Sequence, residues 1–512
     1  MVETLRRPRI DDTIAAEEPQ ALSHRDWSAP GTVAAWVAAA VVALLHLAGA
    51  AHNPTPMLDE GTYAAQAWAV LHLGRLAPYT YWYDHPPLGW ILLAGLWWLL
   101  APLLPHGLDA VAQLRLVLWL WTLVSLAALV GTARRLGWRP AAAVVAVLVW
   151  GVSPLAITLE RLVELDNIAM AFVLVTIWLL ADPRRRLHSV VLAGVAFGLA
   201  MLSVETALLW TPALLWLLRA RYRDERRGVV LWSFLLATGS VGSFYLLYAT
   251  LKGELLPGPG HVSLLGSAAW QLFERAGSGF LLRHGTAAWD LLHGWLALDP
   301  ILVVAIPLAS LGVLSRRVRP YAIAALVYTV LAFRPGYLPS TYPVEAFPAV
   351  ALCAAGLVDG ALERAARLGM GTRGLARLSV LALGLVIGSC WSLADGRHLL
   401  APADQNQLAA EAWLRAHGDR SQPILVANTV WVDVVDMGWH PYQAVVWYSK
   451  ITTDPAVERR YPQGWRDMQL VVVTPQMRAV ASQLPFISEV EHADRLVAQF
   501  GRGLSRIDIY ER

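Results

Sequence analysis

The stretch MLDEGTYAAQAWAVLHLGRLAPYTYWYDHPPLG, residues 57–89, lies between two strongly apolar runs and carries acidic residues near both of its ends. Asp59 and Glu60 open it, and Asp84 and His85 stand just before a Pro-Pro pair near its close. Charged side chains at a membrane boundary are costly unless they are paired or used in function. We therefore expect the chemistry of the protein in this stretch.

The composition around this stretch is typical of a polytopic membrane protein. Of the 512 residues, 56% are hydrophobic and 15% are charged, and the mean hydropathy is +0.47. One soluble core cannot bury so much apolar surface. The net charge of +3 gives no indication of a nucleic-acid partner. Cys353 and Cys390 both lie in apolar runs, so we expect them to act as small hydrophobic side chains.

The basic residues predict how the chain crosses the membrane. They gather in short loops between apolar runs, as the positive-inside rule requires of cytoplasmic loops. These loops all lie on the cytoplasmic side only if the run 88–104 does not cross the membrane. That run contains Pro102 and is followed by Pro105. We expect that run to form a re-entrant or surface helix, which leaves about eleven transmembrane helices. The apolar runs are 32–51, 88–104, 111–133, 141–157, 168–181, 189–203, 206–219, 229–250, 298–314, 320–333, 343–360 and 378–395.

The chain divides into three parts. Residues 1–31 are polar and mixed in sign, which predicts a disordered cytoplasmic tail. Residues 32–395 form the predicted transmembrane domain, with a long external loop at 52–110 that holds re-entrant or surface helices. In residues 396–512 strand and helix signals alternate, which predicts a small extracytoplasmic α/β domain with a partly parallel sheet.

A second group of charges stands in LERLVELDN, residues 159–167, at the external end of a predicted span. Glu160 and Glu164 share one face of a helix, and Arg161 lies beside them. Asp166 immediately precedes the next apolar run, so it can also act as a helix N-cap. Such a density of charge at a membrane boundary indicates function.

A third motif is FRPGYLPSTYPVEAFPAV, residues 333–350, where Arg334 precedes Tyr337 in a Pro-rich loop. Arg334 is a candidate for contact with a phosphate, and the alternative is a simple anchor at the lipid head groups. Alternatives remain open in the first motif as well. Asp59 can serve as an N-cap with Glu60 favouring the helix dipole, and Asp84 with His85 can belong to a structural turn.

Together the three motifs resemble those of the GT-C membrane glycosyltransferases, specifically the protein O-mannosyltransferase and aminoarabinose-transferase-like branch, of the glycosyltransferase family 39 type. The resemblance covers about residues 30–395. It rests on Asp-Glu after the first membrane helix, His-Pro-Pro-Leu-Gly at 85–89, Arg161 followed by Asp166, and a basic residue before Tyr-Leu-Pro. It implies a polyprenyl-monophosphate sugar as donor and inverting transfer of a hexose or pentose by single displacement.

The chemistry of such a donor indicates which residues matter. Its phosphate lies at the head-group level, so the departing phosphate needs a cation such as Arg161 or Arg334, and the acceptor needs a base such as Asp59. We expect Asp59, Glu60 and Asp166 to be catalytic, Arg161, Arg334, Tyr337, Asp84 and His85 to bind the donor phosphate, and Glu160 and Glu164 to support them.

The expected partners are a polyprenyl-phosphate sugar, the lipid bilayer and an acceptor in the cell envelope, which is a glycan, a lipid or a protein. We expect a multi-pass protein of the plasma membrane whose active site faces outward. No cofactor is firmly implied, and a role for a divalent cation stays open. The competing interpretation is a transporter or lipid flippase, because intramembrane charges also occur in those proteins.

The predicted topology can be tested with reporter fusions after Arg139 and after Arg397. The first fusion should report a cytoplasmic location and the second an external one, because only that arrangement keeps the basic loops inside. A cytoplasmic signal from the second fusion would show that the run 88–104 crosses the membrane.

Overall fold

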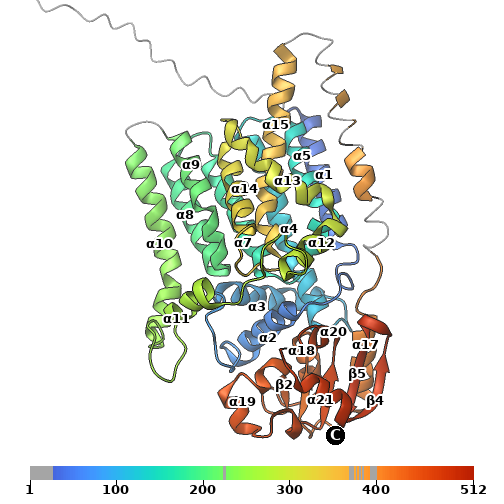
Figure 1. Cartoon of the computed structure of the whole chain (residues 1–512). Helices are drawn as coiled ribbons and strands as arrows, with labels where there is room; N and C mark the ends of the chain where they lie inside the picture. The colour runs from blue at the N-terminus through green and yellow to red at the C-terminus, as the bar shows by residue number, and fades with distance from the viewer. Residues whose placement is uncertain are drawn as a thin grey trace, which may run out of the picture.

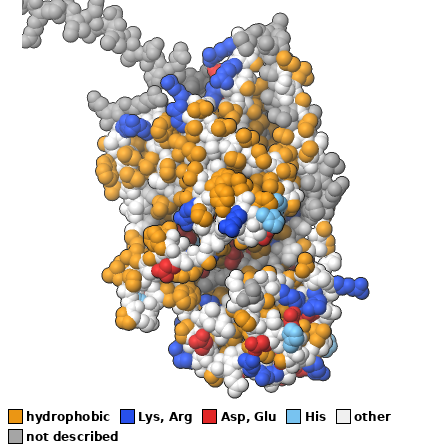
Figure 2. All heavy atoms as spheres, viewed as in Figure 1, with side chains coloured by type: hydrophobic (Ala, Val, Ile, Leu, Met, Phe, Trp, Pro, Cys, Tyr) orange, Lys and Arg blue, Asp and Glu red, His pale blue; other side chains and the backbone are white. Residues whose placement is uncertain are grey.

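The computed structural model describes residues 27–222, 226–367, 400–481 and 483–512, together with a few positions between 374 and 392. A bundle of helices forms its upper part and a C-terminal α/β domain its lower part (Figure 1). Most of the predicted tail, and part of the predicted apolar run 378–395, lie outside the described residues. Hydrophobic side chains cover much of the visible surface of the bundle (Figure 2). The protein is therefore a multi-pass membrane protein in composition and in architecture.

Several helices are suited to crossing a membrane. Among the described residues, four are long and apolar enough: α1 (Ala29–Leu47), α4 (Ala110–Arg135), α10 (Arg227–Leu251) and the segment Tyr342–Arg367. Two bent helix pairs would bring this number to six, and four shorter apolar helices accompany them. The count of about eleven spans therefore stays a prediction. The other helices of this part are α2 (Leu58–Leu73), α3 (Leu88–Leu100), α5 (Pro140–Gly151), α6 (Pro154–Glu160), α7 (Leu165–Leu180), α8 (Leu187–Ser203), α9 (Thr211–Arg221), α11 (Leu264–Ala269), α12 (Ala287–Leu298), α13 (Pro300–Ser310), α14 (Arg319–Ala332) and α15 (Phe347–Arg367), with the short helices η1 (Ala101–Leu103), η2 (Glu205–Trp210), η3 (Trp270–Glu274), η4 (Leu311–Leu314) and η5 (Tyr342–Ala346).

Helices α2 and α3 lie between the bundle and the C-terminal domain (Figure 1). α3 has 13 residues, which at the rise of an α-helix extend about 20 Å, less than the roughly 30 Å of a hydrocarbon core. It packs against α2, α4 and α8. This length fits the prediction that 88–104 does not cross, although the position of the membrane itself stays a prediction.

The C-terminal domain contains a five-stranded sheet with the order β2-β1-β3-β5-β4. β1 is parallel to β2 and β3, whereas β5 is antiparallel to β3 and β4, so the predicted partly parallel sheet is confirmed. Its strands are β1 (Ile424–Val426), β2 (Val445–Trp447), β3 (Leu470–Val473), β4 (Arg495–Phe500) and β5 (Ile507–Glu511). Its helices are α17 (Gln405–His417), α18 (Asn428–Asp436), α19 (Pro455–Arg460), α20 (Pro475–Ala479) and α21 (Phe486–Ala493), with η6 (Tyr448–Ile451), η7 (Gly464–Asp467) and η8 (Gly503–Ser505).

The C-terminal domain packs directly on α2, the helix at the start of the acidic stretch 57–89. α18 contacts α2 where Gly61 lies against the backbone of Asn428 and Thr429. A Cβ atom at Gly61 would come within 2.2 Å of that backbone, so only glycine permits this approach. Asn428 also donates a hydrogen bond from Nδ2 to the Thr62 hydroxyl at 2.7 Å. The domain therefore holds the first turn of α2.

A buried ion pair fixes the same turn from the bundle side. The Arg115 guanidinium of α4 donates to both oxygens of Glu60, from Nε at 2.7 Å and from Nη2 at 2.6 Å. The carboxylate also accepts from the backbone N–H groups of Met57 and Val163, each at 2.9 Å. Both charged side chains are fully buried. This pair joins α2, α4 and the turn between α6 and α7.

Loss of one partner of this pair should destabilise the protein strongly. Arg115→Met leaves the Glu60 carboxylate buried without its cation, which should lower the free energy of unfolding by about 3–5 kcal/mol. Arg466→Met is the control, because its pair with Glu489 is exposed and should contribute less than about 1 kcal/mol. Thermal unfolding of the purified proteins gives the comparison. Equal losses in both variants would contradict the structural role of Glu60.

Candidate functional site

Asp59 lies at the first turn of α2, one residue before the buried Glu60. Its side chain is exposed to solvent, yet desolvation by the surrounding protein raises the pKa of its carboxyl group. Protein atoms therefore surround part of this carboxyl group, and we call its surroundings the recess. His85 and Arg275 lower the pKa of Asp59, whereas Asp84 and Glu60 raise it. Asp59 therefore has two cations and two carboxylates as neighbours.

His85 supplies one of these cations. Its Nε2 lies 3.2 Å from the Tyr63 hydroxyl and its Nδ1 lies 3.1 Å from the Glu205 carboxylate. Desolvation lowers the pKa of His85, but the charges of Glu205, Asp84 and Asp166 outweigh it and raise the pKa to about 9. At neutral pH both ring nitrogens are therefore protonated, and the imidazolium donates to Tyr63 and Glu205.

The loop before His85 is shaped to present these groups. Tyr83 has a φ of 54°, in the left-handed region, which turns the chain immediately before Asp84. The Tyr83 hydroxyl donates to Glu254 at 2.5 Å, and its carbonyl oxygen accepts from the Tyr245 hydroxyl at 3.2 Å. Both contacts come from the end of α10 and the loop after it, so this loop is fixed to the bundle.

Arg275, immediately after η3, supplies the second cation beside Asp59. Its guanidinium carbon lies 3.2 Å from the ring centroid of Tyr337, a close cation–π contact. Its Nη1 donates to Gln271 at 2.7 Å. Tyr337 in turn lies near Asp59 and Glu164, whose charges raise the pKa of its hydroxyl after desolvation, the largest cause. Arg275 and Tyr337 thus close one side of the recess.

Asp166 approaches the recess from the first turn of α7. The Asn167 side chain donates to the carbonyl oxygens of Leu159 and Leu162, at 3.1 and 3.0 Å, and so holds the turn between α6 and α7. The Asp166 side chain lies near that of Glu345 in η5, which accepts a hydrogen bond from the Thr206 hydroxyl.

The C-terminal domain provides the opposite wall through η6. Burial, followed by the charge of Asp59, raises the pKa of the Tyr448 hydroxyl to about 12. Burial lowers the pKa of Lys450, while Asp454 and Asp84 raise it. Tyr448 and Lys450 therefore face the carboxylates of the first motif. Figure 2 shows acidic side chains along the boundary between the bundle and this domain.

The structure brings most of the predicted site residues together. Asp59, Asp84, His85 and Tyr337 line one recess, and Asp166 lies close enough to influence His85. The supporting residues Glu160 and Glu164 are buried beside them, and both lie near Asp166. Desolvation, with Asp59 and Asp166, raises the pKa of Glu164 well above its usual value.

Two predicted residues have a different position from the one expected. Glu60 was predicted to be catalytic, but all its described bonds go to Arg115 and to two backbone N–H groups, so it is a structural residue. Arg161 was predicted to bind the donor phosphate, but it is buried and donates to the carbonyl oxygens of Leu45, His46 and Ala48. It therefore caps the end of α1, where unpaired carbonyls need donors.

Arg334 also differs from expectation. It is exposed, and its guanidinium folds over Gly336 in its own loop. Arg275, one of several charged residues of the long loop after α10, takes the place beside Asp59 instead. Sequence reasoning missed Arg115, Glu205, Glu345, Tyr448 and Lys450 as well. Arg115, Glu205 and Glu345 did carry a signal, since each is a lone charge within or between apolar runs.

No metal centre is formed by the described residues. Among them, no group of three or more His, Cys, Asp and Glu side chains has an arrangement that could hold a metal ion. His85, Arg275 and Lys450 supply positive charge in the recess. These side chains can neutralise an anion without further ligands.

Part of the sequence matches a known protein family. Residues 84–240 match the family described as dolichyl-phosphate-mannose-protein mannosyltransferase. No curated protein sequence matches significantly.

Solved structures resemble the whole chain. ArnT from Cupriavidus metallidurans bound to undecaprenyl phosphate is 16% identical, with a TM-score of 0.60 over 94% of this chain and 98% of ArnT. Its apo form is 17% identical, with a TM-score of 0.58 over the same shares. The archaeal oligosaccharyltransferase AglB from Archaeoglobus fulgidus, in complex with an inhibitory peptide and a dolichol-phosphate, is 13% identical, with a TM-score of 0.53 over 87% of this chain and 70% of AglB.

At these identities the structural matches show the fold, and the family match adds a sequence relationship that begins at Asp84, near the end of the first motif, and includes the second motif. The predicted resemblance is confirmed at the level of the superfamily. The chain therefore has the fold of ArnT and AglB, both membrane glycosyltransferases of the GT-C type, and its residues 84–240 are related in sequence to the mannosyltransferase family.

Proposed function

We propose that the protein transfers a sugar from a polyprenyl-phosphate donor to an acceptor in the cell envelope, at the external face of the plasma membrane. The observation that carries this proposal is the recess at Asp59, where a solvent-open carboxyl group with a raised pKa faces the cations of Arg275 and His85. A base and two cations are the groups that displacement of a phosphate requires. Undecaprenyl phosphate in ArnT and dolichol-phosphate in AglB, two proteins of this fold, support a lipid-linked donor.

Asp59 acts as the base in this mechanism. The acceptor oxygen attacks the anomeric carbon as its proton passes to the Asp59 carboxylate, and the bond between that carbon and the phosphate oxygen breaks. One displacement of this kind inverts the anomeric configuration. The raised pKa of Asp59 makes its carboxylate a stronger base than an ordinary exposed aspartate.

Arg275 and His85 receive the departing phosphate. The phosphate leaves with the electron pair of the broken bond, and its growing negative charge is stabilised by the guanidinium and by the imidazolium. Tyr337 orients the guanidinium through their close contact. Asp166 does not touch the reacting atoms in this mechanism; its charge helps to keep His85 protonated, so it is a positioning residue.

The acceptor approaches along the C-terminal domain. Tyr448 and Lys450 of η6 border the recess from the side of that domain. A glycan, a lipid or a protein can supply the hydroxyl or amino group. Lys450, with Asp84 and Asp454 close by, favours an acceptor that offers hydrogen-bond acceptors near the reacting group.

The proposed function can be tested with the purified protein, a panel of radiolabelled polyprenyl-phosphate sugars and an envelope extract. Label should pass to the acceptor and free polyprenyl phosphate should appear. Asp59→Asn should lower turnover by about 10²- to 10⁴-fold, because the amide keeps the shape and loses the basicity. Asp419→Asn, an exposed aspartate elsewhere in the C-terminal domain, should change nothing.

Two results would contradict the proposal. Turnover of Asp59→Asn within about threefold of the parent would remove Asp59 as the base, given the usual contribution of a base. Movement of the intact donor across vesicle membranes without release of polyprenyl phosphate would instead favour a flippase. The same assay with a chelator reports whether a divalent cation takes part.

The phosphate-binding role of Arg275 has its own test. Arg275→Lys keeps the charge and loses the planar pair of donors, so the KM for the donor should rise about tenfold. Arg161→Lys is the matched control: it should lower the thermal stability, because fewer bonds reach the carbonyls that end α1, and leave the KM unchanged. The reverse pattern would restore Arg161 to the phosphate site.

A further inference from the structure

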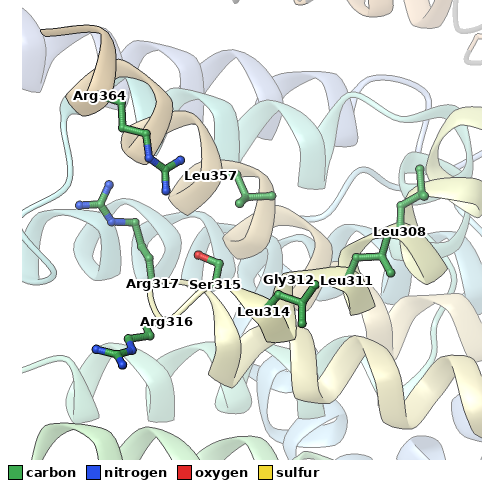
Figure 3. Close-up of a pocket in the computed structure, with 9 residues that line it drawn as sticks. All are labelled: Leu308, Leu311, Gly312, Leu314, Ser315, Arg316, Arg317, Leu357 and Arg364. Atoms are coloured by element: carbon green, nitrogen blue, oxygen red, sulfur yellow. The ribbon is translucent and has the colours of Figure 1, made fainter. Parts of the chain in front are cut away.

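A second concave site lies at the end of the bundle farthest from the recess. α15 begins beside Glu345 in the recess and ends at Arg367, so the two sites are separated by the length of this helix. The cavity has a volume of about 680 Å³. Figure 3 shows Arg317 and Arg364 reaching toward each other at one end of it and the leucines of α13 and η4 at the other. Its lining residues are Leu308, Leu311, Gly312, Leu314, Ser315, Arg316, Arg317, Leu357 and Arg364.

The charged end of this cavity has an excess of arginine. Arg317 pairs with Asp359 at 3.1 Å and with Glu363. Each of these acids also pairs with a further guanidinium, that of Arg139 or that of Arg367. The two carboxylates are thus shared among three arginines.

Two further arginines line the cavity. Arg316 and Arg364 form no ion pair within the part of the chain that the structure describes. Among the described residues in and beside this cavity, five guanidinium groups thus accompany two carboxylates. The surplus positive charge favours an anion.

The other end of the cavity is apolar and open. The exposed fractions of Leu308, Leu311 and Leu314 are 58%, 64% and 83%, and that of Leu357 is 48%. These side chains lie on the outside of a membrane bundle, so hydrocarbon is their natural neighbour. The cavity thus joins a cationic end to a lipid-facing apolar end.

We propose that this cavity binds an anionic phospholipid, with the lipid phosphate at its arginine end and an acyl chain along the leucines. The apolar end of the cavity favours a lipid over free phosphate, because free phosphate would contact only the arginines. Basic pockets between transmembrane helices are a known form of anionic lipid site. The site lies far from Asp59, so it is independent of the transfer reaction, and its failure would leave the proposed function untouched.

Native mass spectrometry of the full-length protein in detergent tests this proposal with two lipids of identical acyl chains, phosphatidylglycerol and phosphatidylcholine. Phosphatidylglycerol should be retained and phosphatidylcholine should not. The double variant Arg316→Gln/Arg364→Gln should bind phosphatidylglycerol about tenfold or more weakly, since each arginine near a lipid head group contributes to the attraction. Arg317 is left in place because its ion pairs hold α15.

The control is Arg184→Gln/Arg219→Gln, which removes the same charge from exposed arginines outside the cavity. It should bind phosphatidylglycerol like the parent. Equal loss in the two double variants would overturn the proposal in favour of general electrostatic attraction, and so would equal retention of the two lipids. Inorganic phosphate is the second arm: displacement of the lipid by low millimolar phosphate would show a free-phosphate site. If the cavity variant does not fold, Arg364→Gln alone is measured in the same way.

Discussion

The bidentate pair of Glu60 and Arg115 is the constraint on which the site depends. A buried carboxylate is tolerated only when it is paired and hydrogen-bonded, and Glu60 meets this condition with four donors from three segments of the chain. The pair fixes the first turn of α2 in the interior. Because successive residues of a helix point about 100° apart, the burial of Glu60 turns its neighbour Asp59 outward into the recess. Of these two adjacent acidic residues, Glu60 thus stabilises the fold, whereas Asp59 faces the recess.

The electrostatics of the recess follow from this placement. The negative charges of Glu205, Asp84 and Asp166 keep His85 protonated. The positive charge of His85 in turn reduces the repulsion among these carboxylates. The recess therefore carries positive and negative groups side by side in a partly desolvated space, where their fields are weakly screened. Such a mixed site can hold an anion and still contain a base, which a uniformly basic pocket could not.

The sequence was sufficient for everything that depends on local pattern. The acidic stretch 57–89, the charges of 159–167 and the partly parallel sheet could each be recognised from composition and spacing. What it could not provide was the partner of each charge. Arg115 lies 55 residues from Glu60, and Arg161 binds carbonyls at the end of α1, contacts that only the packed bundle creates. Arg275 was one of several charged residues in a long loop, and no periodicity in the sequence distinguishes it from the others.

The contact between Gly61 and the backbone of Asn428 has a consequence for how the enzyme is made. The helices of the bundle are all synthesised before the C-terminal domain, yet that domain supplies one wall of the recess and presses on the turn that carries Asp59. A chain that has inserted its last membrane helix is therefore still without a finished site. The site is complete only after β1, α18 and η6 have folded and α18 has docked on α2. If the proposed site is the active one, the order of synthesis keeps the nascent protein inactive until the final domain has emerged and folded.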